Sequence, residues 1–329
     1  MTSLVTGANG FVGAAVVRAL LARGEAVRAL VRPNSNTLNL DDLPVEVVRG
    51  DLTDRQSLQR AAAGCNTVFH VAADYRLWVP NPDAMYLTNI QGSVNMLEVA
   101  AEVGAAQMVY TSSVAVLGIN ADRTPADETT PVTIADMVGH YKRSKFLAEQ
   151  AVRETAKSIG FPVTTVNPST PIGPGDYRPT PTGRIIVDAA NGKMPAFVDT
   201  GLNIAHVDDV AEGHLLARDR GLAGARYILG GADLSLKEIL ALVARHSGRK
   251  APSVRLPRTA LYPVAAACEL WARLGGREPL VTMDELKMAR KHMYFSSRKA
   301  QAELGYSARA AETAIVDALA WFKSHDRIG

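Results

Sequence analysis

The sequence contains only two cysteines, Cys65 and Cys268, among 329 residues. Two cysteines form at most one disulfide bond, too few to stabilise a chain of this size, so we expect a protein of a reducing compartment. No run of about 18 uncharged apolar residues occurs, so no transmembrane helix is predicted. The first residues already form a strand-like stretch and leave no room for a signal peptide. A cytoplasmic location is therefore expected.

The chain also has little excess charge. Its 36 lysine and arginine residues exceed its 33 aspartate and glutamate residues by three. Because no basic run occurs either, nucleic acid is not an expected partner. The 47% hydrophobic and 21% charged residues are typical of a globular protein, and the length predicts one large domain or two.

Short apolar segments alternate with helix-length segments through the first half of the chain. The segments expected to form strands are residues 3–6, 26–31, 45–48, 67–71, 107–111 and 163–166. The segments expected to form helices include residues 13–23, 57–63, 82–103 and 138–159. This alternation predicts right-handed β–α–β units, and hence an α/β fold with a doubly wound parallel sheet covered on both faces.

The pattern changes after about residue 168. Residues 167–183 contain five prolines and three glycines and are predicted to form a loop. Ligands of open parallel sheets bind beyond the carboxyl ends of the strands, where this loop would begin. We therefore predict a nucleotide-binding domain over residues 1–170. Residues 171–329 are expected to form mainly a smaller substrate-binding cap, with residues 203–230 approximately returning to the first domain.

The first predicted strand leads directly into a glycine-rich turn, and a predicted helix follows. The three glycines permit a tight turn and close approach of the backbone to a pyrophosphate. The helix N-terminus offers free N–H groups and a positive dipole end to the phosphates. An ordinary strand–helix turn is the alternative. The predicted dinucleotide-binding residues of this turn are Gly7, Asn9, Gly10, Phe11, Val12 and Gly13.

The end of the second predicted strand distinguishes between cofactors. An acidic residue there usually holds the ribose 2′-hydroxyl of NAD, whereas arginine suits the 2′-phosphate of NADP. Here Arg32 and Ser35 follow the strand, and no carboxylate occurs before Asp41. The sequence therefore favours NADP, with NAD as the alternative; a solvated surface arginine is the other interpretation of Arg32.

The third predicted strand is followed by an aspartate that has two interpretations. Asp51, which precedes Leu52, could accept a hydrogen bond from the adenine amino group. It could equally be a helix N-cap, although Asp54 is the better candidate for that role.

One tyrosine of nine, Tyr141, has a lysine four residues later, Lys145. Positions i and i+4 share a helix face, and a nearby cation lowers a tyrosine pKa from its usual value of about 10. Such a phenol could exchange a proton with a carbonyl or alcohol oxygen while hydride moves to or from carbon. Alone, the pair would more often be a coincidence. Ser112 and Ser113 end the fifth predicted strand, where a serine could hold the substrate oxygen or simply form a polar strand end.

These motifs occur in the order of the extended short-chain dehydrogenase/reductases, which the sequence resembles along essentially its whole length and most specifically over residues 1–170. Further matching segments are Gly50-Asp51-Leu52, Val71-Ala72-Ala73, Asn89-Ile90-Gln91-Gly92, Asn167-Pro168 and His206-Val207-Asp208-Asp209-Val210. Within this family the sequence looks similar to dihydroflavonol 4-reductase-like proteins, and closer still to hopanoid-associated sugar epimerases. The run from Phe69 through His70, Asp74 and Leu77 to Trp78 indicates the latter.

The resemblance implies a Rossmann fold and assigns a role to individual residues. It makes Ser113 the catalytic serine, Tyr141 the general acid and Lys145 the ribose anchor, with Asn89 supporting a proton-relay water. It also implies that Val71, Ala72 and Ala73 line the cofactor and that Pro168 borders the nicotinamide pocket. Relatives pair through helices equivalent to residues 82–103 and 138–159, so we expect a homodimer.

Departures from the family narrow the expected chemistry. Val114-Ala115 stands where sugar dehydratases carry an Asp-Glu pair, so dehydration is not expected. Hydride transfer between nicotinamide and a small carbonyl, alcohol or sugar substrate remains, and Arg32 favours a reductase. The alternatives are a sugar 4-epimerase with tightly held NAD and a non-catalytic dinucleotide sensor, although the intact Ser113, Tyr141 and Lys145 argue against the sensor.

Several other residues have both a functional and a structural interpretation. The candidates for substrate contact, for which loop packing is equally plausible, are Asp74, Tyr75, Arg76, Trp78 and Ser113. The residues that resemble metal ligands by type but match no metal template are His206, Asp208, Asp209 and His214. No metal is therefore expected, and His70 is interpreted as a core histidine.

One later segment raises the question of membrane contact. Residues 256–274 contain Trp271 among apolar residues, with arginines at positions 258, 273 and 277. An interfacial membrane helix has this composition. A cap helix packed on the core explains it as well, and Pro263 limits any continuous helix.

Overall fold

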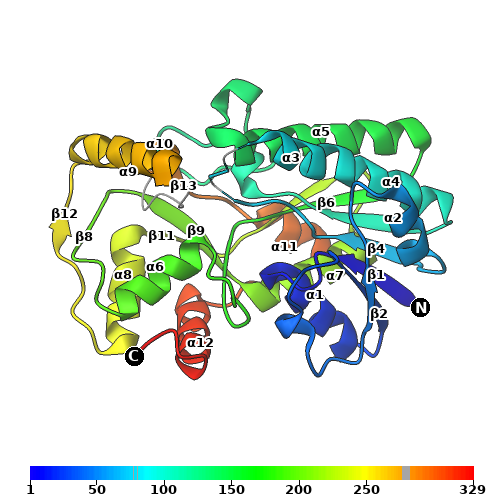
Figure 1. Cartoon of the computed structure of the whole chain (residues 1–329), viewed down its shortest axis with the longest axis horizontal. Helices are drawn as coiled ribbons and strands as arrows, with labels where there is room; N and C mark the ends of the chain where they lie inside the picture. Colours follow the sequence, from blue (N-terminus) through cyan, green and yellow to red (C-terminus); the bar gives the residue numbers. More distant parts are fainter. Residues whose placement is uncertain (77, 80, 276–281) are drawn as a thin grey trace.

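The computed structural model describes residues 1–76, 78–79, 81–275 and 282–329. Leu77 and Arg277, named above, lie outside the described residues. Seven parallel strands form the central sheet in the order β10-β6-β5-β4-β1-β2-β3 (Figure 1). Their bounds are β1 Thr2–Thr6, β2 Ala26–Val31, β3 Glu46–Arg49, β4 Thr67–His70, β5 Gln107–Thr111, β6 Val163–Pro168 and β10 Arg226–Leu229. The strand order reverses between β1 and β4, which confirms the predicted doubly wound sheet.

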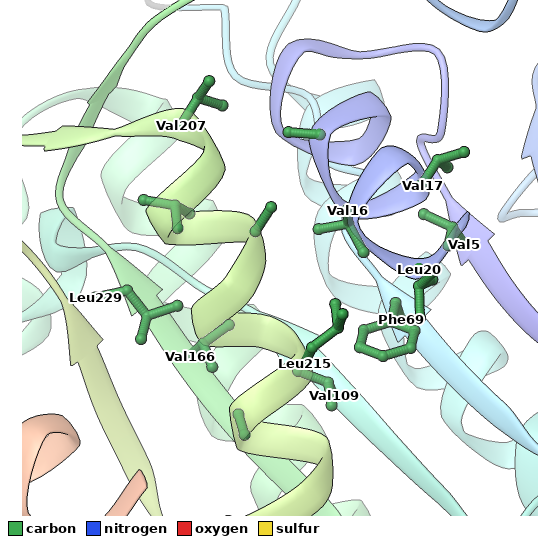
Figure 2. Close-up of a cluster of buried hydrophobic side chains, with 14 of the residues drawn as sticks. Val5, Val16, Val17, Leu20, Phe69, Val109, Val166, Val207, Leu215 and Leu229 are labelled. Atoms are coloured by element: carbon green, nitrogen blue, oxygen red, sulfur yellow. The ribbon is translucent and has the colours of Figure 1, made fainter. Parts of the chain in front are cut away.

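Apolar side chains from alternate positions of the strands fill both faces of this sheet, because successive residues of a strand point to opposite sides. On one face Val5, Phe69 and Val109 pack against Val16 and Leu215 (Figure 2). The helices of this face are α1 Phe11–Ala22, α7 Val207–Arg220 and α11 Arg298–Leu304. The helices of the other face are α2 Arg55–Ala62, α4 Gly92–Glu102 and α5 Gly139–Ile159. Burial on both faces explains why the strands are almost continuously apolar.

The single helix predicted over residues 82–103 is interrupted. It consists of α3 Asp83–Tyr86, a π-helical segment Leu87–Gln91 and α4. A π-helical turn inserts extra backbone into a helix and often occurs at functional sites. Here it contains the buried Asn89, whose side chain bonds to neighbouring segments rather than to its own helix.

The prediction of a loop over residues 167–183 is wrong at both ends. Strand β6 continues through Pro168, β7 covers Thr170–Ile172, and α6 covers Pro181–Ala190. Pro181 occupies the first turn of α6, where its missing N–H is not needed. The Thr180 hydroxyl caps that helix by accepting a 3.1 Å hydrogen bond from the Gly183 N–H.

The C-terminal part of the chain builds a second, smaller arrangement. Strand β9 (Gly201–His206) pairs with β7, β11 (Ala232–Ser235) and β13 (His292–Met293), and β8 (Ala196–Phe197) pairs with β12 (Val254–Arg255). Helices α6, α8 (Leu236–Ser247) and α12 (Ala311–Ser324) enclose a third apolar cluster. Because α7, β10 and α11 pack with the central sheet and α12 does not, the chain crosses between the two parts more than once (Figure 1). The domain boundary at residue 170 stays a prediction.

Helix α9 (Tyr262–Gly275) and α10 (Met283–Met288) complete this region. Pro263 lies in the first turn of α9, where proline is tolerated, and a separate 3-10 turn covers Arg258–Leu261, so no continuous α-helix covers residues 256–274, as expected. The Trp271 side chain is 71% exposed and Leu270 is 61% exposed. In the described parts of the chain, no helix is long and apolar enough to cross a bilayer. Membrane contact through α9 stays a hypothesis.

Candidate active site

The glycine-rich turn is too tightly closed for a side chain at two of its glycines, Gly7 and Gly13. Gly7 has φ +65°, and a Cβ added there would lie 2.8 Å from the Cα of Ala72. A Cβ at Gly13 would lie 2.1 Å from the carbonyl oxygen of Gly7. The Gly10 N–H donates a 2.9 Å hydrogen bond to that same oxygen. The backbone of β1, the turn and α1 therefore approach one another as a dinucleotide cradle requires.

The N-terminus of α1 is open to an anion. Its N-cap is Gly10, which has no side chain to accept from the first N–H groups, and no acidic residue lies in the first turn, where Phe11, Val12 and Gly13 stand. These N–H groups suit the oxygens of a pyrophosphate. Asn9 connects the turn to the segment after β2, because its side chain donates a 2.8 Å hydrogen bond to the carbonyl oxygen of Asn36.

Arg32 is exposed at the end of β2, as the sequence predicts. Its backbone is braced from two sides: its carbonyl oxygen accepts hydrogen bonds from the Ser35 N–H at 3.1 Å and from Nη1 of Arg49 at 3.2 Å. The positive charge of Arg32 contributes to lowering the pKa of both Asp51 and Asp74. The Arg32 guanidinium therefore lies on the side of the sheet edge where β3 and β4 end.

The predicted adenine contacts have partners within the chain. One oxygen of Asp51 accepts hydrogen bonds from the N–H and the hydroxyl of Thr53, which lower its pKa. Leu52 is buried in the apolar cluster under α2 and α4. Asp54 caps α2 by accepting from the N–H groups of Gln56 and Ser57, as predicted.

A buried hydrogen-bond chain supports the segment that would line the cofactor. The Ala72 N–H donates to Oγ1 of Thr6 at 3.1 Å, and Thr6 and Nδ1 of His70 are 2.9 Å apart. Nε2 of His70 lies 2.9 Å from the Ser93 hydroxyl, which donates to the carbonyl oxygen of Asn89 at 2.7 Å. Burial lowers the pKa of His70 to about 3. The interpretation of His70 as a neutral core histidine is confirmed.

The side chain of Asn89 is fully used in positioning its neighbours. Its Oδ1 accepts a 2.7 Å hydrogen bond from the Asp74 N–H, and its Nδ2 donates to the Asp74 carbonyl oxygen at 3.0 Å and to the Ser144 hydroxyl at 2.9 Å. Ser144 in turn donates to the Tyr141 carbonyl oxygen. Asn89 thus joins the segment after β4 to α5. Sequence reasoning missed Ser144, although its place between Tyr141 and Lys145 was a signal.

The catalytic serine and tyrosine predicted from the sequence are brought together. Ser113 caps the short helical turn after β5, and its Oγ accepts a 3.1 Å hydrogen bond from the Ala115 N–H. Burial raises the pKa of Tyr141 above its usual value, although the nearby Ser113 hydroxyl acts to lower it. The Ser112 hydroxyl, in contrast, is buried without a partner in the described parts of the chain. The geometry agrees with the choice of Ser113 over Ser112.

Lys145 is buried on α5 but does not lower the pKa of Tyr141, the effect expected from the sequence. Its ammonium donates to the Thr111 carbonyl oxygen at 2.9 Å and to the Tyr110 hydroxyl at 3.3 Å. Burial lowers the pKa of Lys145 itself to about 8. The expectation that Lys145 brings the Tyr141 pKa below its usual value is therefore wrong, because burial raises this pKa and the cause that opposes burial is Ser113.

The segment after β4 contains the candidate substrate contacts. Arg76 is 61% exposed and pairs with the carboxylate of Asp74, Nε to Oδ1 being 2.9 Å, so its charge already has a partner. Tyr75 is 47% exposed, and Trp78 is half-buried. The negative charge of Asp176 contributes to raising the pKa of Tyr75, which places the loop before α6 on the same side of the molecule.

Other predicted residues have structural surroundings. Val71, Ala72 and Ala73 are half-buried at the end of β4, and Pro168 is buried where β6 pairs with Leu229. The four residues that resemble metal ligands by type belong to α7 or its N-cap. His206 is the N-cap, Asp208 and Asp209 lie in the first turn, and His214 donates Nδ1–H to the Val210 carbonyl oxygen at 2.7 Å. Within the described residues, no group of three or more His, Cys, Asp or Glu side chains is placed to hold a metal ion.

Comparisons with known proteins agree with this geometry. The family model described as NAD dependent epimerase/dehydratase family matches residues 3–230. The chain is 45% identical over 325 residues, 98% of its length and 94% of the relative, to a putative dihydroflavonol 4-reductase of Synechocystis sp.. It is 34% identical to sterol demethylase protein B of Methylococcus capsulatus over 100% of both chains.

A solved structure gives the same result for the fold. The crystal structure of gox2253 has 51% sequence identity and a TM-score of 0.90, and the match covers 100% of this chain and 99% of that one. The family model, which matches more than half of the chain, and the 45% identity to the relative from Synechocystis show that the chain belongs to the NAD dependent epimerase/dehydratase family, a family of the extended short-chain dehydrogenase/reductases.

Proposed function

We propose that this chain is an NADP-dependent reductase of a carbonyl substrate. The observation that carries the proposal is that the Ser113 hydroxyl, just after β5, lies near enough to Tyr141 to lower the pKa of its phenol, with the buried Lys145 four residues later on α5. Two neighbouring hydroxyls can together bind one carbonyl oxygen and stabilise the negative charge that develops on it. The reductase name of the relative from Synechocystis supports the same reaction class.

The raised pKa of Tyr141 suits a proton donor. Because the pKa of Tyr141 lies above the usual value of about 10, the phenol stays protonated at neutral pH and can give its proton to the substrate oxygen. Ser113 donates a second hydrogen bond to that oxygen, and Lys145, largely cationic below its pKa of about 8, would hold the nicotinamide ribose. Bound NADPH would supply the hydride to the carbonyl carbon.

The backbone of the glycine turn favours binding of a dinucleotide, and Arg32 favours NADP over NAD. No acidic residue stands at the end of β2 to prefer a free 2′-hydroxyl. Arg32 is exposed and can turn its guanidinium from Asp51 and Asp74 toward a 2′-phosphate, with the Ser35 hydroxyl beside it.

Binding of the two cofactors tests this assignment. We expect wild-type protein to bind NADPH more tightly than NADH, and Arg32→Ala to raise the Kd of NADPH about 10- to 100-fold while changing that of NADH less than about 3-fold. Fluorescence of the reduced nicotinamide measures both constants. Arg60→Ala, which removes an exposed arginine from α2, is the matched control. Equal losses for both cofactors, or tighter binding of NADH by wild type, contradict the NADP assignment.

The reaction itself separates the alternatives. A reductase consumes one NADPH for each carbonyl group reduced. A sugar 4-epimerase would instead interconvert sugars with tightly held NAD and no net oxidation of the cofactor. A dinucleotide sensor would catalyse neither reaction.

Helices α4 and α5 lie side by side on one face of the sheet (Figure 1). We expect a homodimer through them, which light scattering would detect as twice the 35.1 kDa mass.

A further inference from the structure

A cavity of about 70 Å³ lies beside the segment that follows Ser113. Its lining includes Ala115, Leu117, Asp136, Met137, Lys142 and Lys291. Ala115 donates its N–H to the Ser113 hydroxyl, and Lys142 directly follows Tyr141 on α5. The volume is several times the roughly 10–15 Å³ that one water requires. The cavity therefore has room for a small polar group, two residues from Ser113 and next to Tyr141 in sequence.

Lys142 is a buried amine without a counter-ion. The residue is 8% exposed, and the nearest polar contact of its Nζ is Sδ of Met293 at 4.0 Å. Within the described residues no carboxylate pairs with it. Burial, and next the charge of Lys291, lower its pKa to about 8. An ammonium group buried in this way is costly and is usually compensated by an anion.

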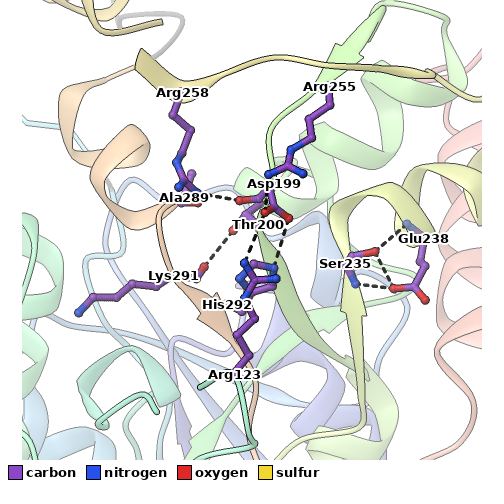
Figure 3. Close-up of polar contacts among 10 residues, drawn as sticks. All are labelled: Arg123, Asp199, Thr200, Ser235, Glu238, Arg255, Arg258, Ala289, Lys291 and His292. Atoms are coloured by element: carbon purple, nitrogen blue, oxygen red, sulfur yellow. Dashed lines mark hydrogen bonds and ion pairs between the residues drawn. The ribbon is translucent and has the colours of Figure 1, made fainter. Parts of the chain in front are cut away.

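Lys291 brings a second positive charge to the same cavity. It directly precedes β13, is exposed, and lines the cavity together with Lys142. The Thr200 hydroxyl fixes its backbone by donating a 3.0 Å hydrogen bond to its carbonyl oxygen. Figure 3 shows the side chain of Lys291 extending away from the ion pairs around Asp199.

The lining of the cavity carries an excess of positive charge. Asp136 is the acidic residue among the lining residues, and one of its oxygens accepts hydrogen bonds from the N–H and the hydroxyl of Thr133, both at 2.9 Å. Asp136 interacts electrostatically with the exposed Lys291, so among the lining residues the buried Lys142 is the cation without a carboxylate partner. One further negative charge would neutralise the lining.

We propose that this cavity binds an anionic oxygen group, a carboxylate or a phosphate, of the molecule whose carbonyl group Ser113 and Tyr141 bind. The inference rests on the proposed reductase function and specifies its substrate class. The substrate is a carbonyl compound with an acid group a few bonds from the carbonyl carbon. The acid group accepts hydrogen bonds from Lys142 and Lys291, so the carbonyl is oriented from a second point.

Anion binding tests the cavity without any turnover. Acetate and inorganic phosphate are titrated calorimetrically into wild type, Lys142→Met and Lys157→Met. Lys157→Met is the matched control because Lys157 is an exposed lysine at the end of the same helix. We expect wild type and the control to bind one of the two ions, which identifies the acid group, and Lys142→Met to bind it at least about 10-fold more weakly. Equal binding by all three proteins, or by none, overturns the inference.

Kinetics test the substrate class. A short 3-oxo acid and its methyl ester are compared with NADPH as the reductant, or the corresponding phosphate and neutral alcohol if phosphate is the ion bound. We expect wild type to prefer the charged compound, and Lys142→Met to lower that preference at least about 10-fold through KM, while Lys157→Met retains it. Reduction of both compounds with a preference that Lys142→Met does not change removes the inference and leaves the reductase. Anion binding without reduction of any carbonyl compound removes the proposed function instead.

Folding of the variant is checked independently. Replacing a buried ammonium that lacks a counter-ion by methionine removes a desolvation cost, so Lys142→Met is expected to unfold at the same or a higher temperature than wild type at neutral pH. Thermal unfolding followed by circular dichroism measures this. A loss of anion binding in a stable variant therefore reports the cavity.

Discussion

The polar contacts beneath the catalytic residues and those that hold the C-terminal region differ in their exposure to water. In the nucleotide-binding part, His70 and His214 are fully buried, and each has a partner on both ring nitrogens. In the C-terminal region, Asp199 meets Arg123, which is 60% exposed, and Arg255, which is 64% exposed (Figure 3). Buried hydrogen bonds fix one geometry, whereas exposed ion pairs contribute little and re-form easily. We therefore expect a more rigid nucleotide-binding side and a more adaptable C-terminal side.

The largest expected effect comes from the rigid side. In Gly13→Ala the new Cβ meets the Gly7 carbonyl oxygen at 2.1 Å, and neither backbone can yield without opening the turn. We expect the Kd of NADPH to rise at least about 100-fold, because the turn places the amides that hold the pyrophosphate. Gly10→Ala, whose Cβ would be 3.2 Å from the same oxygen, should cost less. Near-normal NADPH binding by folded Gly13→Ala would show that the turn is not rigid.

An intermediate effect is expected from the buried histidines in acid. The pKa of His214 is lowered to about 4 and that of His70 to about 3, mainly by burial, against about 6.5 in an unfolded chain. Between these values the unfolded chain binds more protons, so stability is complete above pH 6.5 and falls as the pH decreases toward 4. Each histidine contributes at most about 1.4 kcal/mol per pH unit.

Urea unfolding at several pH values measures this slope. His214→Gln should unfold with a smaller decrease between pH 6.5 and 5 than wild type, although its stability at pH 7 is lower because the bond to Thr111 is changed. Parallel pH profiles for wild type and His214→Gln would contradict the assignment of a buried neutral histidine.

The smallest effect is expected from the exposed ion pairs. Asp199→Asn should lower the free energy of unfolding by about 0.2–1 kcal/mol in dilute buffer, and by less in about 1 M salt, where exposed charges are screened. Urea unfolding at both salt concentrations is the measurement. A loss above about 2 kcal/mol, or one that salt does not reduce, would remove the distinction between the two regions.

The sheet could be predicted because its pattern is local. Strand β5 has the predicted bounds Gln107–Thr111, and β2 has the predicted bounds Ala26–Val31, since a strand buried on both faces must be almost continuously apolar. The prolines of residues 167–183 were misleading, because Pro168 ends a strand and Pro181 begins a helix, positions at which proline is tolerated.

The sequence was enough to select Tyr141 and Lys145 as a pair, but not to predict the direction in which the pKa of Tyr141 is shifted. The spacing of Tyr141 and Lys145 gives a shared helix face, but the partners of the lysine come from β5, more than 30 residues away in sequence. Burial of Tyr141, which sets the direction of its pKa, likewise depends on segments that only folding brings together. The interactions of Asp199 with Arg255 and His292 join distant segments that share no periodic pattern.

The proton-donating role of Tyr141 is tested most directly by Tyr141→Phe, with turnover and NADPH binding measured on the same preparation. The substitution removes one hydroxyl and keeps the ring, so the Kd of NADPH should change less than about 3-fold. Carbonyl reduction should fall by about 10²- to 10⁴-fold, the contribution expected of a general acid. Reduction within about 3-fold of wild type would contradict the mechanism.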